Sequence, residues 1–346
     1  MAYQLVTGGS GYFGSVLVKR LASQGARVRI FDLFDAHDRP DGVEFVQGDI
    51  RDPEAVARAC RGADAVHHNV ALVPLAKDRS AFWSVNTEGT RTLLEACLAE
   101  GVRKVIYTSS SAVFGVPERN PVDDTVLPRP REAYGKAKLA AEVLCAEYVR
   151  RGLDVTIIRP RTIIGAGRLG IMQVAFEWIR TGRNVPVLGD GRNIYQFVHA
   201  SDLADACLRA AGRPGAATYN IGAAEFGTMR ETLEGLIAHA GTASRVVSLP
   251  MAPAVIGMSI TSAIGLSPLA PYHALMYGRS MYFDISRPRD ELQWAPRYSN
   301  AEMFAEAYDW YVSNRESPSS GAAASHHRSA VKQGVLRAVG WMLRLR

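Results

Sequence analysis

The sequence contains little cysteine and no close pair of cysteines. Only four occur, at Cys60, Cys97, Cys145 and Cys207, and none of them forms a Cys-x-x-Cys motif. This spacing argues against a zinc site or a disulfide framework, and it suits a reducing compartment. We therefore expect a cytoplasmic protein that holds no metal ion.

Signals for entry into a membrane are also lacking. The first residues, MAYQLVTGGSGYFG, contain no basic region followed by an apolar core, so we expect no signal peptide. Residues 246–278 contain no Asp, Glu, Lys or Arg, but prolines divide this segment. Its longest uninterrupted piece, residues 254–267, is shorter than the roughly 20 residues that span a bilayer. We expect this segment to form an apolar cap over a substrate.

Most of the chain lacks net charge, although the formal net charge of the whole is +6. Residues 317–346 contain five basic residues and no acidic one, and without them the net charge falls to +1. A nearly neutral body argues against a general affinity for nucleic acid. The length of 346 residues leaves room for one large α/β domain or two smaller ones.

Short apolar segments alternate with helical patterns along the first half of the chain. The pattern predicts helices at residues 53–62, 86–101 and 133–152, and strands at residues 3–7, 26–32, 43–49, 63–69, 104–110 and 154–160. Strands that alternate with helices form parallel sheets covered on both faces. The sequence therefore predicts an α/β protein with a doubly wound parallel sheet, the Rossmann fold.

A glycine-rich turn follows the first expected strand. Gly8, Gly11 and Gly14 are spaced three residues apart and precede an amphipathic segment. Glycines at such a turn allow the backbone to approach a pyrophosphate and the helix to pack closely on the strand. Asp32 ends the second expected strand, where a carboxylate can bind ribose hydroxyls and would repel a 2′-phosphate. This pattern favours NAD over NADP as a ligand.

Tyr134 and Lys138 lie one helical turn apart in the stretch EAYGKAKLAAE. A tyrosine has an unperturbed pKa of about 10, and a nearby ammonium lowers that pKa by favouring the phenolate. The strand before this helix ends in four hydroxyl residues, 108–111, and ligands bind at the carboxyl ends of such strands. Lys138 could therefore hold a cofactor ribose and prepare Tyr134 as a proton shuttle.

Together these motifs resemble the extended short-chain dehydrogenases/reductases, in particular the NAD-dependent epimerase/dehydratase family. The resemblance covers roughly residues 3–313. It depends on these motifs in this order: TGGSGYFG, Asp32, GDI (48–50), HHNVA (67–71), VNTEGT (85–90), YTSSSAVFG, YGKAK, IIRPRTIIG (157–165), QFVHASDLADA (196–206) and ELQWAPRYS (291–299).

The resemblance implies a role for each matching residue. Tyr134 and Lys138 match the catalytic pair, and Ser110 matches the catalytic Ser/Thr when the register is fixed on VFG, with Ser109 or Ser111 as the match if the register slips by one. The residues that would bind NAD are Gly8, Gly11, Tyr12, Phe13, Gly14, Asp32, Asp49, Ile50, Val70, Ala71, Asn86, Tyr134 and Lys138. Members of this family often form homodimers through helices of the dinucleotide domain, and we expect the same here.

The resemblance also suggests how the chain is divided. We expect a dinucleotide-binding Rossmann domain, a smaller mixed substrate-binding subdomain, a flexible linker and a basic amphipathic tail helix. The expected bounds are 1–165 with 196–222 for the first, 166–195 with 223–315 for the second, 316–329 for the linker and 330–346 for the tail.

The chain departs from the family's usual pattern in the substrate half. Ser111-Ala112 stands where the 4,6-dehydratases have an Asp-Glu pair, so a dehydratase is not expected. Thr162 replaces a usual Asn, and Tyr195-Gln196-Phe197 stands where Arg-Asp-Phe is usual, whose Arg normally grips the phosphates of a sugar nucleotide. Other arginines that could take over this task are Arg168, Arg183, Arg192 and Arg279.

Three functions remain open at this point. The first is an NAD-dependent sugar epimerase or related oxidoreductase acting on a nucleotide-linked or lipid-linked sugar. The second is an enzyme like the 3β-hydroxysteroid dehydrogenases, acting on an apolar alcohol or ketone; the charge-free segment favours this alternative. The third is an NAD-sensing binding protein, against which the intact Ser110, Tyr134 and Lys138 argue.

The tail generates a prediction about membranes. Residues 330–346, AVKQGVLRAVGWMLRLR, place apolar side chains along one helical stripe and basic side chains mainly off it. Such a helix gains about 1 kcal/mol per basic residue at an anionic surface. We expect the full chain to co-sediment with anionic liposomes, less so at high salt, and a chain truncated after Ser317 to stay in solution. Equal sedimentation of the two chains would contradict a role for the tail at membranes.

Overall fold

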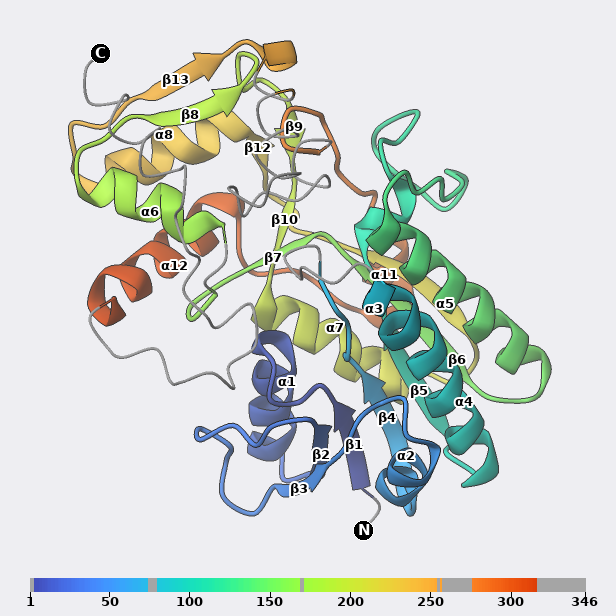
Figure 1. Ribbon diagram of the computed structural model, residues 1–346. Helices are drawn as coiled ribbons and strands as arrows, with labels where there is room; N and C mark the ends of the chain where they lie inside the picture. The colour runs from blue at the N-terminus through green and yellow to red at the C-terminus, as the bar shows by residue number, and fades with distance from the viewer. Residues whose placement is uncertain (1–2, 74–79, 169–170, 254–255, 257–275, 316–346) are drawn as a thin grey trace.

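The structure is a computed structural model, which describes residues 3–73, 80–168, 171–253, 256 and 276–315 (Figure 1). The expected linker and tail helix, residues 316–346, lie outside the described residues, as does most of the charge-free segment. Within the described ranges, no helix is both long enough and apolar enough to cross a membrane.

A seven-stranded parallel sheet forms the centre of the molecule and confirms the predicted Rossmann architecture. Its strand order is β11-β6-β5-β4-β1-β2-β3. The strands are β1 (Tyr3–Thr7), β2 (Arg27–Asp32), β3 (Glu44–Gln47), β4 (Ala63–His68), β5 (Lys104–Thr108), β6 (Val155–Pro160) and β11 (Ala217–Ile221). The order reverses direction between β1 and β4, and ligands of open α/β sheets bind outside the carboxyl ends of the strands at such a point.

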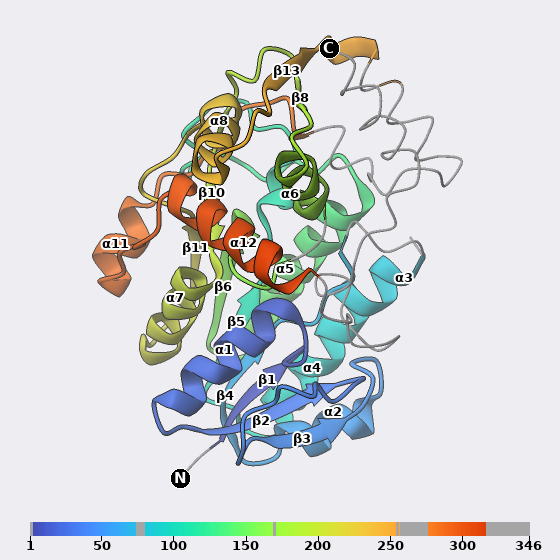
Figure 2. The same ribbon diagram turned by 90° about the vertical axis from the view of Figure 1, so that its left-hand side faces the viewer.

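Helices cover both faces of this sheet (Figures 1 and 2). Two of them pack together on one face, in the first apolar core: α1 (Tyr12–Ser23) and α7 (Ala200–Gly212). The other face holds a second core formed with α2 (Pro53–Cys60), α4 (Gly89–Ala99) and α5 (Ala133–Arg150). A short helix, α3 (Ser80–Trp83), and a π-helical turn, η1 (Ser84–Glu88), lead into α4, so the expected helix at 86–101 begins with a π turn.

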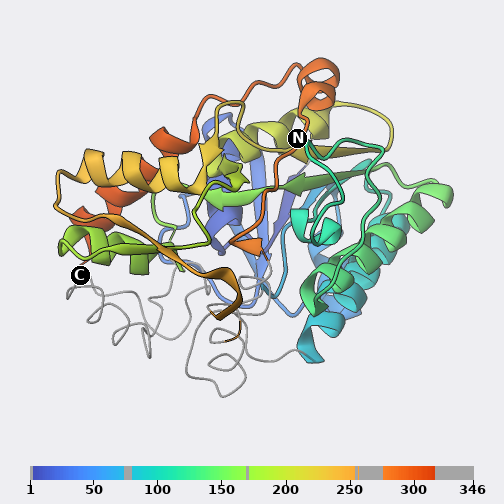
Figure 3. The same cartoon turned by 90° about the horizontal axis from the view of Figure 1, so that it is seen from above.

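A smaller mixed subdomain stands above the carboxyl ends of the strands (Figures 1 and 3). Its core lies among α6 (Met172–Arg180), α8 (Met229–Ala240), α12 (Asn300–Asn314) and the parallel pair β8 (Val185–Leu188) and β13 (Val246–Leu249). Two further strand pairs connect it to the sheet: β7 (Thr162–Ile164) with β10 (Phe197–His199), and β9 (Ile194–Tyr195) with β12 (Gly227–Thr228). The remaining elements are a 3₁₀ turn, η2 (Ser111–Phe114), and α11 (Ser286–Leu292), which packs against α7 and β11.

A buried carboxylate in the first turn of α7 ties this sheet layer to the C-terminal part of the chain. Asp202 is only 1% exposed, and it accepts hydrogen bonds from the backbone N–H groups of Arg297 (2.9 Å) and Tyr298 (3.1 Å). The Arg297 Nε also donates to it (3.2 Å), and the indole N–H of Trp294 donates to its backbone carbonyl (2.9 Å). One residue therefore satisfies donors that precede α12.

We expect Asp202→Ala to destabilise the protein by about 2–5 kcal/mol, because it leaves two backbone N–H groups without their acceptor and removes one of the two carboxylates that pair with Arg297. Denaturant unfolding, read as the shift of the midpoint, measures this loss. Asp290→Ala is the matched control: Asp290 is exposed, and its replacement should change stability by no more than about 0.5 kcal/mol. Equal midpoints for the two variants would show that the Asp202 contacts carry no net stability.

Candidate active site

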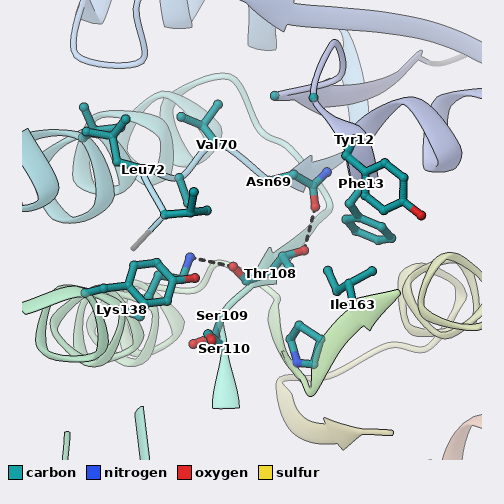
Figure 4. Close-up of a pocket in the computed structure, with 18 of the residues that line it drawn as sticks. Tyr12, Phe13, Asn69, Val70, Leu72, Thr108, Ser109, Ser110, Lys138 and Ile163 are labelled. Atoms are coloured by element: carbon teal, nitrogen blue, oxygen red, sulfur yellow. Dashed lines mark hydrogen bonds between the residues drawn. The ribbon is translucent and has the colours of Figure 1, made fainter. Parts of the chain in front are cut away.

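A cavity of about 470 Å³ opens at the carboxyl ends of the central strands, where the strand order reverses (Figure 4). Nearly all of the residues that the sequence predicted for the site line it together: Gly8, Gly11, Tyr12, Phe13, Gly14, Asp32, Asp49, Ile50, Val70, Ala71, Ser110, Tyr134 and Lys138. They come from segments spread over the first 140 residues. The structure therefore brings the predicted cofactor residues and the predicted catalytic residues into one continuous space.

The glycine turn is packed too closely to hold side chains. A Cβ atom on Gly14 would lie 2.1 Å from the carbonyl oxygen of Gly8, and Gly8 itself has a φ of +71°. Helix α1 begins directly after this turn, and no side chain caps its N-terminus. The buried hydroxyl of Ser10, which belongs to a residue lining the cavity, has no partner among the described residues. These features fit a pyrophosphate bound at the helix N-terminus.

Asp32 lies at the end of β2 and faces both the cavity and the glycine turn. Its carboxylate accepts hydrogen bonds from the backbone N–H groups of Ser10 (3.1 Å) and Leu33 (2.7 Å). Burial raises the pKa of Asp32, and these N–H groups oppose that rise. The carboxylate thus holds the turn in place in addition to lining the cavity.

The far end of the cavity, beyond Asp32, combines apolar surface with one ion pair. Leu33 and Phe34 line it and are about half exposed, at 48% and 49%. Asp49 pairs with Arg51 (2.5 Å), and the hydrogen bond from Arg51 lowers the pKa of Asp49. Leu33 and Phe34 were missed in the sequence, where the only signal was two apolar residues directly after Asp32.

Asn86 is the one predicted site residue that does not line the cavity. It is 1% exposed, in the π turn η1, and its side-chain amide makes two hydrogen bonds with the backbone of Leu72, at 2.8 and 3.0 Å. Leu72 and Val70 do line the cavity. Asn86 therefore fixes the segment that follows β4 and acts on the cavity only through that segment.

The candidate catalytic residues meet where the end of β5 packs against the start of α5. The Lys138 ammonium donates a hydrogen bond to the Thr108 carbonyl (2.6 Å; Figure 4). It also lies 4.2 Å above the ring of Tyr107. Ser110 hydrogen-bonds Tyr134. Glu132 caps α5 by accepting the backbone N–H of Tyr134 (2.8 Å), which fixes the helix that carries both Tyr134 and Lys138.

The pKa values in this cluster differ from the sequence-based expectation. We expected Lys138 to lower the pKa of Tyr134, but burial raises it to about 12, and the Ser110 hydrogen bond only partly opposes this rise. Burial also lowers the pKa of Lys138 to about 7. Both shifts favour the uncharged forms, because the two side chains are 9% and 1% exposed. The depth of the site was not visible in the spacing of the two residues.

The structure separates the arginines that the sequence offered for the substrate. Arg168 lines the cavity, whereas Arg183, Arg192 and Arg279 do not. Arg192 is exposed and lies 3.7 Å from Asp190. No described carboxylate lies within ion-pair distance of Arg168, which has Tyr12, Tyr134 and Tyr277 around it, and burial lowers its pKa. Arg168 is therefore a cation at the substrate end of the cavity, close to Tyr134.

Tyr195, which stands in place of the family's usual arginine, does not line the cavity, and neither does Gln196 beside it. Both are fully buried, the Gln196 amide donates to the Ala223 carbonyl (2.6 Å), and its side-chain carbonyl accepts the N–H of Phe283 (2.9 Å). Arg161, which we did not single out in the sequence, lines the cavity instead. It is 1% exposed and donates to the hydroxyl of Ser111 (2.9 Å). Thr162 also lines the cavity.

Known proteins resemble this chain over most of its length. A model of the NAD dependent epimerase/dehydratase family matches residues 4–222. The uncharacterized protein y4nG of Sinorhizobium fredii is 54% identical over 99% of this chain and 86% of that protein. The UDP-glucose 4-epimerase of Streptomyces lividans is 28% identical over 90% of this chain and 96% of that enzyme. The structure of the Thermus thermophilus UDP-glucose 4-epimerase in complex with NAD superposes with a TM-score of 0.73, at 27% identity, over 91% of this chain and 99% of that one.

Asp32 generates a prediction about the choice of dinucleotide. Wild-type protein should bind NAD more tightly than NADP, and Asp32→Ala should narrow this difference by about tenfold or more, which corresponds to roughly 1.4 kcal/mol. Asp32→Asn removes the charge but keeps an acceptor for the Ser10 N–H. Asp32→Asn should therefore narrow the difference in affinity between NAD and NADP without loosening the glycine turn. Calorimetric titration of both nucleotides measures the effect, and a wild-type preference for NADP would overturn our interpretation of Asp32.

Proposed function

The chain belongs to the NAD-dependent epimerase/dehydratase family, and from this premise we propose that it is an NAD-dependent oxidoreductase or epimerase of a sugar. The sugar would be linked to a nucleotide or to a lipid. Ser110, Tyr134 and Lys138 would carry the chemistry, with hydride transfer to NAD. The support is their convergence with the glycine turn in a single cavity.

The residues of the cavity fit NAD along its length. Gly8, Gly11 and the uncapped start of α1 would hold the pyrophosphate, and Asp32 the adenosine ribose. Lys138 would hold the nicotinamide ribose, since its ammonium already faces the strand ends. When bound, NAD supplies a hydride acceptor for a carbon atom of the substrate.

Side chains of the protein itself would transfer the proton of the substrate hydroxyl. The Tyr134 phenolate would take the proton from a substrate hydroxyl and become a phenol, and before this transfer the hydroxyl of Ser110 would donate a hydrogen bond to the phenolate. Because burial holds the pKa of Tyr134 at about 12 in the protein alone, the phenolate requires positive charge nearby. The Arg168 guanidinium lowers this pKa, so the substrate end of the cavity contributes to the same effect.

The presence of Arg168 in the cavity is the observation that favours a sugar substrate over an apolar alcohol. A guanidinium at the substrate end suits a substrate that bears an anionic group, such as the diphosphate of a nucleotide-linked or lipid-linked sugar. A site for a neutral, apolar molecule would leave this cation buried against an uncharged ligand, which costs desolvation energy.

A 3β-hydroxysteroid-dehydrogenase-like activity is the second candidate. The apolar side chains of Leu72, Val85 and Met172 line the same end of the cavity and favour an apolar ring system. The two candidates differ in stoichiometry. A 4-epimerase returns the hydride to its substrate, so that no NADH accumulates, whereas a dehydrogenase consumes one NAD for each turnover.

The deciding experiment incubates the protein with NAD and either nucleotide sugars or apolar alcohols, and follows product stereochemistry and NADH absorbance. We expect a sugar to change configuration with catalytic NAD. Tyr134→Phe should lower turnover by about 10²–10⁴-fold and keep NAD binding, as for loss of a general acid–base group. Tyr3→Phe, at the amino end of β1, is the matched control and should change neither. Stoichiometric NADH from the true substrate would contradict an epimerase, and near-normal turnover in Tyr134→Phe would contradict the mechanism.

A further inference from the structure

Three successive turns of α5 each contact the end of β5. Tyr134 hydrogen-bonds Ser110, Lys138 donates to the Thr108 carbonyl (2.6 Å), and Glu142 accepts the hydroxyl of Ser109 (2.5 Å). The three helix residues are four apart and therefore share one face of the helix. The first two belong to the proposed catalytic site, but nothing in that mechanism uses the third.

Glu142 is a buried carboxylate held in one position. It is 4% exposed, and Arg159 on β6 donates to both of its oxygens, at 2.9 and 2.6 Å. Together with the Ser109 hydroxyl, these bonds fix the carboxylate on the Lys138 side of the helix. A buried carboxylate is costly, and a pairing with Arg159 alone would suffice for a purely structural contact.

The surroundings of Lys138 show what a negative charge could do there. The groups that face its ammonium are Tyr107 of β5, His68 of β4, and Glu142 and Cys145 of α5, and Arg159 of β6 pairs with Glu142. The pKa of His68 is about 3, and burial raises the pKa values of Tyr107 and Cys145, so these three side chains are uncharged at neutral pH. Glu142 is thus the one carboxyl group among the described groups that act on Lys138.

We propose that Glu142 is a positioning residue of the active site: its fixed carboxylate is the counter-charge that keeps Lys138 protonated, and so able to hold the dinucleotide. This inference depends on the proposed function, in which Lys138 binds the cofactor ribose. The sign follows from charge. Burial lowers the pKa of Lys138 and Glu142 raises it, so removal of the carboxylate should let the ammonium lose its proton at lower pH.

The test is the pH dependence of NAD affinity, measured by calorimetry between about pH 5.5 and about pH 9. This range extends to both sides of the pKa of Lys138, which is about 7. In the wild-type protein, affinity should decline as pH rises through this range. In Glu142→Gln, which keeps a carbonyl acceptor for Ser109, the decline should begin about one pH unit lower. An unchanged decline would overturn the proposal.

Two control variants separate charge from packing. Ser109→Ala removes a hydrogen bond to Glu142 but keeps its charge, so its decline should match that of the wild type. Glu147→Gln removes a carboxylate from the next turn of the same helix, where no ion pair is formed with described residues, and it should also match. A shift of the same size in either variant would mean that loosened packing, rather than charge, sets the titration.

A further variant distinguishes this proposal from the function on which it depends. Lys138→Met should weaken NAD binding and abolish the decline of NAD affinity with rising pH. If Lys138→Met binds NAD like the wild type, the proposed role of Lys138 fails; if it weakens binding while Glu142→Gln titrates normally, only the role of Glu142 fails. If Glu142→Gln does not fold, the double variant Glu142→Gln/Arg159→Gln takes its place, because it removes both charges of the ion pair together. That variant should shift the decline in the same direction by a smaller amount, and no shift would again overturn the proposal.

Discussion

The close packing of α5 on the segment that follows β5 determines where every candidate catalytic group lies. A Cβ atom on Gly135 would come within 2.5 Å of the Ala112 carbonyl oxygen, so the two backbones approach as closely as a glycine permits. This approach buries Tyr134, Lys138 and Glu142 along one side of the helix. Their side chains then reach three neighbouring residues of the strand end. The chemistry of the site follows from this depth, because burial sets the charge states on which proton transfer depends.

The cofactor half of the site could be predicted from the sequence, since its signals are local. Gly8 and Gly14 are needed by the backbone itself, and Asp32 occupies a fixed place at the end of the next strand. The alternation of strands and helices likewise specified the sheet, because each element carries its own hydrophobic pattern. What could not be predicted depends on contacts between distant segments. Spacing suggested a lowered pKa for Tyr134, whereas burial by several elements raises it.

The substrate half resisted prediction for a related reason. Four arginines were equivalent in the sequence, and only the fold shows that Arg168 reaches the cavity while Arg192 points to solvent. Tyr195, at the place of the family's phosphate-binding arginine, is fully buried, and Gln196 beside it bridges two backbone segments. Arg161 was overlooked because an arginine between a proline and a threonine gives no sign of being buried. Charge is therefore unevenly placed: Asp32 and the paired Asp49 and Arg51 line one end of the cavity, and Arg161 and Arg168 line the other.

The Asp202 contacts also determine an order in which parts of the protein can form during synthesis. A chain leaves the ribosome from its N-terminus, so the strands of the sheet up to β6 are complete long before Asp202 appears, and β11 follows shortly after it. The donors that satisfy this carboxylate, at Arg297 and Tyr298, are made about a hundred residues later. Until then the carboxylate of Asp202 in the nascent chain lacks the hydrogen-bond donors that surround it in the folded protein. The last sixth of the chain thus completes a structure whose central-sheet strands all lie within the first two thirds.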